Sequence, residues 1–352
     1  MWLYWVLFWL PAVAALGVIE LRMGGSKINP AMLALAVLLA LAIGLRFEVG
    51  MDWGNYLEQF NYANDYSFAE TLFKGDPAYG LLNWLAVNVG FGVWMPNLVC
   101  AIMFASGLVV FCRKLPNPWL ALTIAMPYMA IVMAMNYTRQ GAAFGLVLWG
   151  LVALQDGQIR RFLVFIVLAA LFHKTAILLI PLALFGSTVS YFQTFLWVST
   201  STILGYVVFI AEHEIGFYEN YILEQYASDG AAVRVAMNSV AAVVFLLARS
   251  LTKMEPLDRV LWTRFSLVTL VFLPLLELSP SSTAVDRMAL YFMPIQLVAF
   301  SYLPNIAARW GLERIAVLGV VAGYWAVMFV WFNYANFSFA WLPYRFYPIE
   351  MM

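Results

Sequence analysis

Long apolar runs separated by short polar segments recur along almost the whole chain. A helix needs roughly 20 residues to cross the ~30 Å of hydrocarbon in a bilayer, and most of the runs approach or reach that length. They are continuous rather than alternating, as in residues 31–45 and 162–171, which favours helices over the strands of a membrane barrel. We predict spans at 2–21, 29–46, 94–112, 118–136, 138–155, 190–211, 233–250, 257–276, 287–304 and 312–334.

Two further apolar segments are too short or too polar for a full crossing. Residues 161–186 are interrupted at His173 and Lys174, so we expect two half-length pieces that enter the membrane and return. Residues 78–92 contain asparagines and glycines and are expected to form a re-entrant or interfacial helix. The predicted fold is an all-α polytopic integral membrane protein of about 11–13 transmembrane helices, including re-entrant or half-length pieces. We expect residues 1–352 to form a single transmembrane domain.

The composition supports a membrane protein and excludes several other classes. Of the 352 residues, 64% are hydrophobic and 11% are charged, whereas a soluble domain carries about a quarter charged residues. The net charge is zero, so there is no case for a nucleic-acid partner. Cys100 and Cys112 lie in one apolar run and are expected to be small buried residues rather than a disulfide.

The distribution of lysine and arginine predicts the orientation. Five short loops carry Arg22 and Lys27; Arg113 and Lys114; Arg160 and Arg161; Arg249, Lys253 and Arg259; and Arg309 and Arg314. All five lie on one side, the cytoplasmic side, if 78–92 does not cross and 161–186 returns. Acidic loops near 46–93 and 211–232 then face outside. We therefore select this topology.

Four cations run against that bias. They lie on the outer side, at or just inside the ends of apolar runs: Arg46, Arg139, Lys174 and Arg287. Because an ionisable residue at such a position is costly, it is by default a functional-site hypothesis.

The first motif extends from Arg46 to Tyr56 and contains Glu48 and Asp52. Asp52 and Tyr56 are four residues apart, so a helix would place both on one face. The alternative is an ordinary interfacial loop with a snorkelling arginine.

The second motif is Asn136-Tyr-Thr-Arg139-Gln140, which joins two apolar helices with almost no loop. Arg139 begins the second helix, and an arginine at a helix N-terminus is suited to bind an anion such as phosphate. The alternative is a tight polar turn whose arginine reaches lipid headgroups.

The third and fourth motifs add a histidine and a second arginine. His173 is expected below the membrane surface, where burial and the adjacent Lys174 favour a neutral imidazole that can accept a proton. A structural histidine at a helix break is the alternative. Asp286 and Arg287 precede Tyr291 and, taken alone, resemble a charged helix start. They are of interest because the predicted topology places them on the outer side of the membrane, together with the other motifs.

Several catalytic signatures are absent from the sequence. It contains no H-E-x-x-H, Cys/His cluster, G-x-S-x-G or P-loop. Asp52 and Glu48 are carboxylates that could bind a metal, but nothing in their spacing requires one. We expect neither a metal nor a cofactor.

The ordered motifs resemble those of the EpsG-like branch of Wzy-type bacterial polysaccharide polymerases. The matching positions are Arg46 with Val49-Gly50-Met51-Asp52-Trp53 and Tyr56, then Tyr79-Gly80, Asn136 to Gln140, Phe172-His173, and Arg287 with Tyr291. Met51 and Trp53 replace the threonine and tyrosine of the family pattern, Tyr79-Gly80 is in reversed order, and Lys174-Thr175 departs from the pattern. The resemblance covers about residues 40–300, and the last 50 or so residues carry no match.

The resemblance implies an integral-membrane glycosyltransferase related to the GT-C class. Such an enzyme joins repeat units at the periplasmic or outer face of the bacterial cytoplasmic membrane. It transfers a glycan from undecaprenyl diphosphate to the non-reducing end of another lipid-linked unit, without a metal and with inversion in a single displacement. A chain-length regulator protein is the usual partner, and membrane lipid surrounds the enzyme.

The residue roles that follow are expectations. Asp52 and His173 are the candidate catalytic bases and are not ranked. Diphosphate binding is assigned to Arg46, Arg139, Lys174 and Arg287, and other substrate binding to Glu48, Tyr56, Gln140, Asp286 and Tyr291. The alternatives are a lipid-linked oligosaccharide flippase or transporter, a membrane O-acyltransferase and an O-antigen ligase.

Overall fold

The computed structural model describes residues 1–17, 29–73, 75–184, 192, 199 and 230–351, and these residues are helical without a β-strand. The helices before residue 185 are α1 (Trp2–Ala15), α2 (Pro30–Gly44), α3 (Trp53–Tyr62), α4 (Phe68–Phe73), α5 (Pro77–Val89), α6 (Trp94–Arg113), α7 (Pro118–Ala125), the π-helix η1 (Met126–Ala134), α8 (Thr138–Gln155), α9 (Ile159–Phe172) and the 3₁₀ helix η2 (Lys174–Leu184). The later ones are α11 (Ala231–Ala248), η4 (Arg249–Leu251), α12 (Pro256–Leu278), α13 (Ser282–Ala289), η5 (Leu290–Phe292), α14 (Pro294–Ala307), η6 (Ala308–Trp310), α15 (Glu313–Tyr334), η7 (Ser338–Trp341) and α16 (Tyr347–Glu350).

The described part of the chain has four helices that are long and apolar enough to cross a membrane: α6, α11 with η4, α12 and α15. A fifth span results if Ser282–Phe292 and Pro294–Trp310, which are bent by 42°, count as one. Helices α1 and α2 and the stretch Pro118–Ala134 are apolar but shorter. The chain is thus an all-α, multi-pass membrane protein, as predicted.

Some of the predicted topology is not covered. The predicted span at 190–211 and most of the predicted outer loop at 211–232 lie outside the described residues. The total of about 11–13 spans and the single-domain organisation therefore stay predictions.

Two of the predicted apolar segments are interrupted in the structure. Helix α9 ends at Phe172, His173 is extended, and a 3₁₀ helix follows, which is the predicted interruption. The predicted span at 287–304 is instead divided, because the chain bends between α13 with η5 and α14. Pro294 at the start of α14 lacks an amide hydrogen, so it cannot continue the preceding helix's hydrogen bonds.

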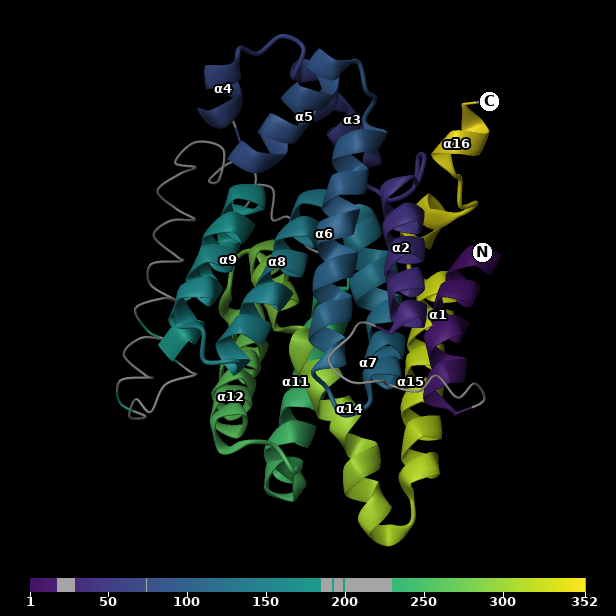
Figure 1. Cartoon of the computed structure of the whole chain (residues 1–352), viewed down its shortest axis with the longest axis vertical. Coiled ribbons are helices and arrows are strands. Elements are labelled where there is room, and N and C mark those ends of the chain that lie inside the picture. The colour runs from purple at the N-terminus through teal and green to yellow at the C-terminus, as the bar shows by residue number, and fades with distance from the viewer. Residues whose placement is uncertain (18–28, 74, 185–191, 193–198, 200–229, 352) are drawn as a thin grey trace.

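The helices form two packed groups (Figure 1). Helix α8 packs against α6 and α9, and α2 packs against α6. Helix α11 packs against α12, α13 and α14, while α7 lies between the groups and contacts α1, α14 and α15. Helices α6 and α8 approach each other closely, because a methyl group on Gly107 would overlap the backbone of Gly145. Small residues allow such backbone contact between apolar helices.

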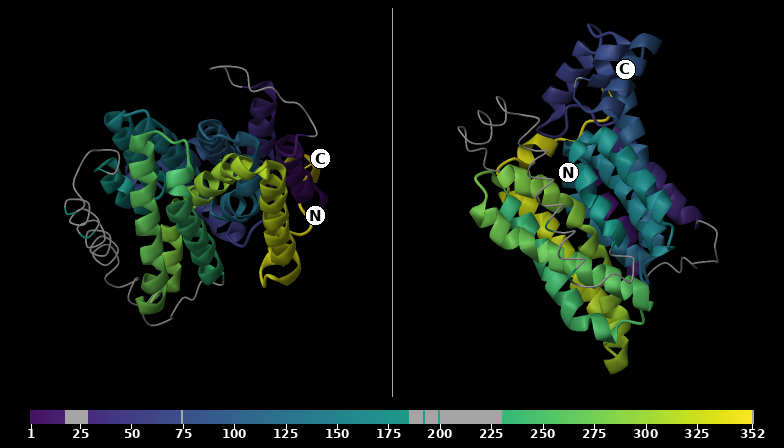
Figure 2. Two further views of the ribbon diagram at one scale, coloured as in Figure 1. Left: turned by 90° about the horizontal axis from the view of Figure 1, so that it is seen from below. Right: turned by 90° about the vertical axis from the view of Figure 1, so that its left-hand side faces the viewer.

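Helices α3, α4 and α5 form a cap, residues 53–73 and 75–89, at one end of the bundle (Figure 1), and the side view in Figure 2 shows the same arrangement. Basic loops meet at the opposite end. There Lys114 Nζ lies 2.6 Å from Asp156 Oδ1, and Arg309 Nη2 donates to Leu251 O at 2.8 Å. Four of the five predicted basic loops and the cap therefore lie at different ends, as the charge pattern predicted, whereas the loop with Arg22 and Lys27 lies outside the described residues.

A C-terminal strap, residues 338–350, returns to the cap end. Backbone hydrogen bonds join it to the first motif and to the residue before that motif. They run from Phe47 N to Arg345 O at 3.0 Å, from Gly50 N to Ala340 O at 2.9 Å and from Tyr347 N to Leu45 O at 2.8 Å. The Trp341 indole donates to Ile131 O at 2.9 Å and holds the strap to η1. The strap thus supports the segment that carries Asp52.

Candidate active site

Asp76, immediately before α5, connects two of the predicted motifs. Its Oδ2 accepts a hydrogen bond from Arg139 Nη1 at 2.7 Å and lies 3.9 Å from His173 Nδ1. Its Oδ1 accepts from the backbone N of Lys174 at 3.4 Å. Asp76 is 7% exposed, so this carboxylate is buried beside the Arg139 cation, the His173 ring and a backbone N–H group. The cap, α8 and the break after α9 therefore meet at one side chain.

The charge of Asp76 is stabilised by these neighbours. Burial opposes ionisation of the carboxyl, but the His173 ring and the Arg139 charge together outweigh burial. The pKa of Asp76 consequently lies below its ordinary value of 3.8. The side chain is an anion within a cluster of hydrogen-bond donors.

Two tyrosines of the cap flank Arg139. The centroids of the Tyr56 and Tyr79 rings lie 5.9 and 6.0 Å from the guanidinium carbon, and the two rings meet edge to face at 5.6 Å. A cation close to aromatic faces is stabilised by the quadrupoles of the rings. Tyr56 was predicted to lie at the site, whereas Tyr79 was noted only as part of a motif.

The first and second motifs touch directly. The backbone N of Asp52 donates to Asn136 Oδ1 at 3.1 Å. Gly50 has a φ of +97°, and a side chain there would overlap the carbonyl of Met135. Asp52 is partly buried before α3, where burial raises its pKa, while the charges of Arg287 and Arg139 oppose that rise. Asp52 therefore lies within the electrostatic reach of the arginines.

Arg287 is the partly exposed cation of the site. Gln140 Nε2 donates to the backbone carbonyl of Arg287 at 2.7 Å, which ties α13 to the start of α8. The Arg287 guanidinium forms no hydrogen bond or ion pair with another described residue. Its charge is thus available to an anion at the site.

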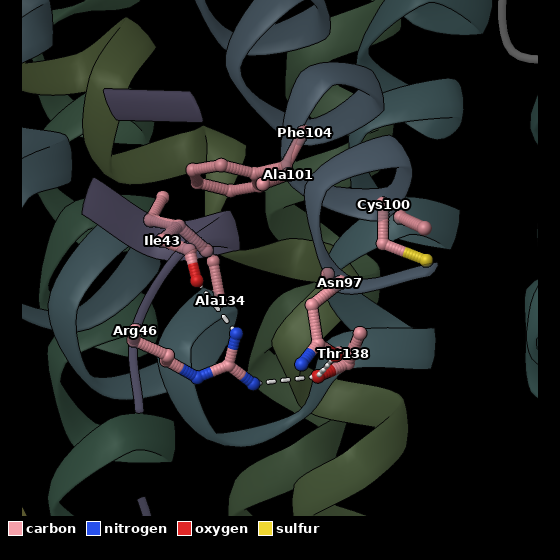
Figure 3. A pocket seen from close by; sticks show the side chains of 10 residues that line it. Ile43, Arg46, Asn97, Cys100, Ala101, Phe104, Ala134 and Thr138 are labelled. Carbon is pink, nitrogen blue, oxygen red and sulfur yellow. Dashed lines mark hydrogen bonds between the residues drawn. The ribbon is translucent and has the colours of Figure 1, made fainter. Parts of the chain in front are cut away.

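Arg46 lies deeper than expected, in a small internal pocket (Figure 3). It is 1% exposed, and its guanidinium donates to Ile43 O at 2.6 Å, Thr138 Oγ1 at 2.7 Å and Val49 O at 3.3 Å. These partners belong to the protein, so Arg46 joins the end of α2 to the start of α8. Its diphosphate role stays a prediction.

Glu48 and Asp286 also have protein partners. Glu48 is exposed, with a φ of +52°, and its carboxylate pairs with Arg345 of the strap. Asp286 is buried and accepts from Arg234 Nε at 2.7 Å and Nη2 at 2.5 Å. Their predicted contact with substrate is not tested by this geometry.

Several buried polar atoms near Asp76 lack a hydrogen-bond partner in the part of the chain that the structure describes. They are His173 Nε2, Tyr79 Oη, Thr175 Oγ1 and Tyr291 Oη, of which the last two lie close to each other. Tyr291 was predicted to bind substrate. Native proteins pair most buried polar atoms, so unpaired ones require an explanation such as a ligand. The described residues contain no group of three His, Cys, Asp or Glu side chains that could hold a metal ion.

Sequence reasoning did not single out Asp76, Arg234 or Arg345. Asp76 precedes Pro77, and an acidic residue before a proline is a helix-start signal that could have identified it. Arg234 is an intramembrane cation within the predicted span 233–250, so the rule applied to Arg139 would have found it. Nothing in the sequence around Arg345 indicates its partner.

Comparison with known proteins identifies the family of this chain. No curated protein and no solved structure matches the chain. The model of the EpsG family matches residues 31–346, which is nearly the whole chain and includes every predicted site residue. The match extends beyond the 40–300 range expected from the motifs and takes in most of the strap. This chain therefore belongs to the EpsG family, whose members are Wzy-type polymerases.

Proposed function

We propose that this protein polymerises lipid-linked oligosaccharide repeat units. It transfers a glycan from undecaprenyl diphosphate to the non-reducing end of another lipid-linked unit, at the outer face of the bacterial cytoplasmic membrane. Membership of the EpsG family supports a polysaccharide polymerase-type function in general. The observation that carries the finer proposal is the meeting of Arg139, Asp76 and His173 beneath the cap.

The arginines of the site suit a diphosphate. Arg139 keeps 29% of its side chain exposed beside Asp76, and Arg287 has no acidic partner among the described residues. Guanidinium groups bind phosphate oxygens in a bidentate manner. They stabilise the charge that develops on the diphosphate as the glycosidic bond breaks. Lys174, next to His173 in the chain, is also assigned to diphosphate binding.

The reaction is a single displacement. The acceptor hydroxyl oxygen attacks the anomeric carbon, the bond from that carbon to the diphosphate oxygen breaks, and the configuration inverts. A base must take the hydroxyl proton, and His173 and Asp52 are the candidates. Undecaprenyl diphosphate is a good leaving group, so the chemistry requires no metal. The proposal includes a GT-C-like architecture and a chain-length regulator as partner.

The aromatic and polar side chains near the cluster suit a sugar. Tyr56 lies against the Arg139 guanidinium, and the hydroxyl groups of Tyr79 and Tyr291 are buried without described partners. Tyrosine rings pack on sugar faces while hydroxyl groups exchange hydrogen bonds with them. Gln140, Asp286 and Glu48 complete the proposed substrate contacts.

Complementation of a deletion strain tests the proposal. Wild type, Arg139→Ala, His173→Ala and, as matched control, Asp156→Asn are expressed, and surface glycan is run beside extracted undecaprenyl-linked material. Asp156 pairs with Lys114 in an exposed ion pair at the other end of the bundle. We expect the deletion and Arg139→Ala to lose the long ladder and accumulate single units on undecaprenyl diphosphate at the outer face.

Other outcomes identify the alternative functions. Single units that accumulate facing the cytoplasm would indicate a flippase. Loss of an acyl modification with an intact ladder would indicate an acyltransferase. Full-length polymer left on undecaprenyl diphosphate would indicate a ligase. A normal ladder in Arg139→Ala would contradict the assignment of the diphosphate to that residue.

A further inference from the structure

The cap contributes one acidic side chain to the cluster beneath it. Asp76 stands at the point where the chain enters α5, and its two carboxylate oxygens contact α8 and the break after α9. A buried carboxylate is costly unless it is paired and hydrogen-bonded. Here the pairing selects Arg139 and His173, which the proposed reaction uses for different steps. That coincidence requires a physical explanation.

We propose that Asp76 is a positioning residue of this site, which keeps the Nε2 atom of His173 free to accept the acceptor hydroxyl proton and fixes Arg139 against the diphosphate. The inference rests on the proposed function and deepens it, because it selects His173 over Asp52 as the base.

The first step of the argument concerns the histidine ring. A carboxylate beside Nδ1 favours the tautomer that carries its proton on that nitrogen, which leaves Nε2 as the acceptor. In the structure Nδ1 lies 3.9 Å from Asp76 Oδ2, and catalytic hydrogen bonds of this kind often tighten only when substrate is bound. Nε2 is buried and has no hydrogen-bond partner among the described residues. The free nitrogen is thus the one that Asp76 does not face.

The second step concerns the charge that forms during the reaction. Once His173 takes a proton, the ring becomes a cation close to Arg139 and Arg287, whose charges disfavour it. Lys174 follows the ring in the chain and adds to the positive surroundings. Asp76 is the acidic group that contacts both His173 and Arg139, so it compensates this repulsion. Asp52, the alternative candidate base, is influenced by the same arginines.

The third step concerns Arg139. Its Nη1 hydrogen-bonds to Asp76, and the Tyr56 and Tyr79 rings lie at distances expected for cation–π contact, 5.9 and 6.0 Å from the guanidinium carbon. A planar guanidinium held at one nitrogen and flanked by rings has little rotational freedom. Its remaining N–H groups keep a constant direction, which favours bidentate binding of phosphate oxygens.

The test uses the purified full-length chain with lipid-linked repeat units extracted from the deletion strain. Polymer formation is measured as kcat and KM against pH for wild type, Asp76→Asn, Asp76→Glu and the control Asp156→Asn. We expect kcat of Asp76→Asn to fall about 10- to 100-fold, because part of the general-base contribution is lost. We also expect its acid limb to move to lower pH, since a neutral amide no longer stabilises the imidazolium. Asp76→Glu restores part of the rate, and Asp156→Asn matches wild type.

Three results would overturn the inference. One is a wild-type rate and pH profile for Asp76→Asn. Another is a loss of rate without any change in the acid limb and without rescue by Asp76→Glu, which would indicate a structural role. The third concerns the double variant Asp76→Asn/His173→Ala. Its loss of kcat would equal the product of the two single losses if the residues acted independently, whereas residues that act as a unit are non-additive. Melting temperatures of all variants identify any that fail to fold, in which case Asp76→Glu decides.

The proposed function fails in a different way. If the wild-type protein forms no polymer from the extracted units, the polymerase assignment is wrong, and this inference falls with it. If wild type polymerises and only the Asp76 variants behave unexpectedly, the polymerase assignment stands and the positioning role alone is rejected.

Discussion

Arg234 of α11 and Asp286 of α13, which lie 52 residues apart in the chain, form a bidentate ion pair between the two helices. The distances are 2.7 Å for Nε to Oδ1 and 2.5 Å for Nη2 to Oδ2, and 7% and 2% of the side chains are exposed. The pair fixes the turn of α13 that also carries Arg287. A nearby polar chain runs from Asn238 to Gln296 at 2.7 Å and on to Tyr324 at 2.6 Å, so α11, α14 and α15 are joined as well.

Breaking this pair should be costly. Arg234→Met leaves the buried Asp286 carboxylate without its main partner, and the loss of one member of a buried pair typically costs about 3–5 kcal/mol. We expect a large fall in the melting temperature of the detergent-solubilised protein. The exposed control Lys114→Met should cost less than ~1 kcal/mol. Equal effects of the two substitutions would show that burial of the pair is unimportant.

Arg287 and Arg46 should separate activity from stability. Arg287→Gln removes a partly exposed cation without an acidic partner among the described residues, so the rate should fall about 10²-fold at an unchanged melting temperature. Arg46→Gln removes buried hydrogen bonds to protein carbonyl groups and should cost about 1–3 kcal/mol of stability. Thermal unfolding and polymer assays on both variants check this. A stable Arg46→Gln protein without activity would support the predicted role of Arg46 in diphosphate binding.

The contact between α6 and α8 leaves no room for a side chain. Gly145→Ala places a methyl group against the backbone carbonyl of Met103, so the helices must separate, at about 1–3 kcal/mol. Gly323→Ala in α15 is the matched control, because nothing lies within 4 Å of the added methyl group. Melting temperatures should fall for the first variant only. An unchanged Gly145→Ala protein would mean that the helices can move apart freely.

The stabilising effect of Asp76 should depend on pH. Its pKa is lower in the folded protein than the ordinary 3.8, so the folded state binds fewer protons than the unfolded state near that pH. The resulting stabilisation is present above the ordinary value and is lost as the pH falls through the folded-state pKa. The difference in melting temperature between wild type and Asp76→Asn should therefore be largest at about pH 7 and shrink below about pH 4. A difference that grows on acidification would contradict the pairing of Asp76 with Arg139.

The C-terminal strap should be required for activity. Truncation from residue 338 removes the backbone hydrogen bonds to Leu45, Phe47 and Gly50, which hold the segment before Asp52. Misplacement of a site by ~1 Å can cost about 10²-fold in rate, so we expect little polymer in membranes that still contain the protein. Arg345→Ala keeps the backbone bonds and removes ion pairs with the partly or fully exposed Glu48 and Glu350, so it should polymerise normally. Normal polymer from the truncated protein would exclude this role.

Two features of the site could be predicted from the sequence: the set of motifs, and their position at the same end of the bundle. Arg139, His173 and Arg287 were found because a cation or histidine at the end of an apolar run is costly and therefore conspicuous. Their contacts were not predictable, since each is made by a residue distant in sequence. Asp76 lies 63 residues before Arg139, and only the packing of the cap on α8 brings them together.

The same limit explains the residues whose surroundings differ from expectation. Arg46 follows an apolar run just as Arg139 precedes one, yet Arg46 is 1% exposed and Arg139 keeps 29% of its side chain exposed. Periodicity and charge place both near a helix end, but burial depends on which elements cover that end. The strap covers Arg46, and nothing in the strap's sequence indicates that it packs there.

Apolar run length, charge bias and breaking residues determined by themselves that this chain is an all-α membrane protein with its polar motifs on one face, because the bilayer imposes those constraints on local sequence. The tertiary structure alone decided which polar groups pair: Asp76 with Arg139, Arg234 with Asp286 and the strap with the first motif. These pairings depend on the relative positions of helices, and those positions are set by packing between segments far apart in the chain, which no local pattern records.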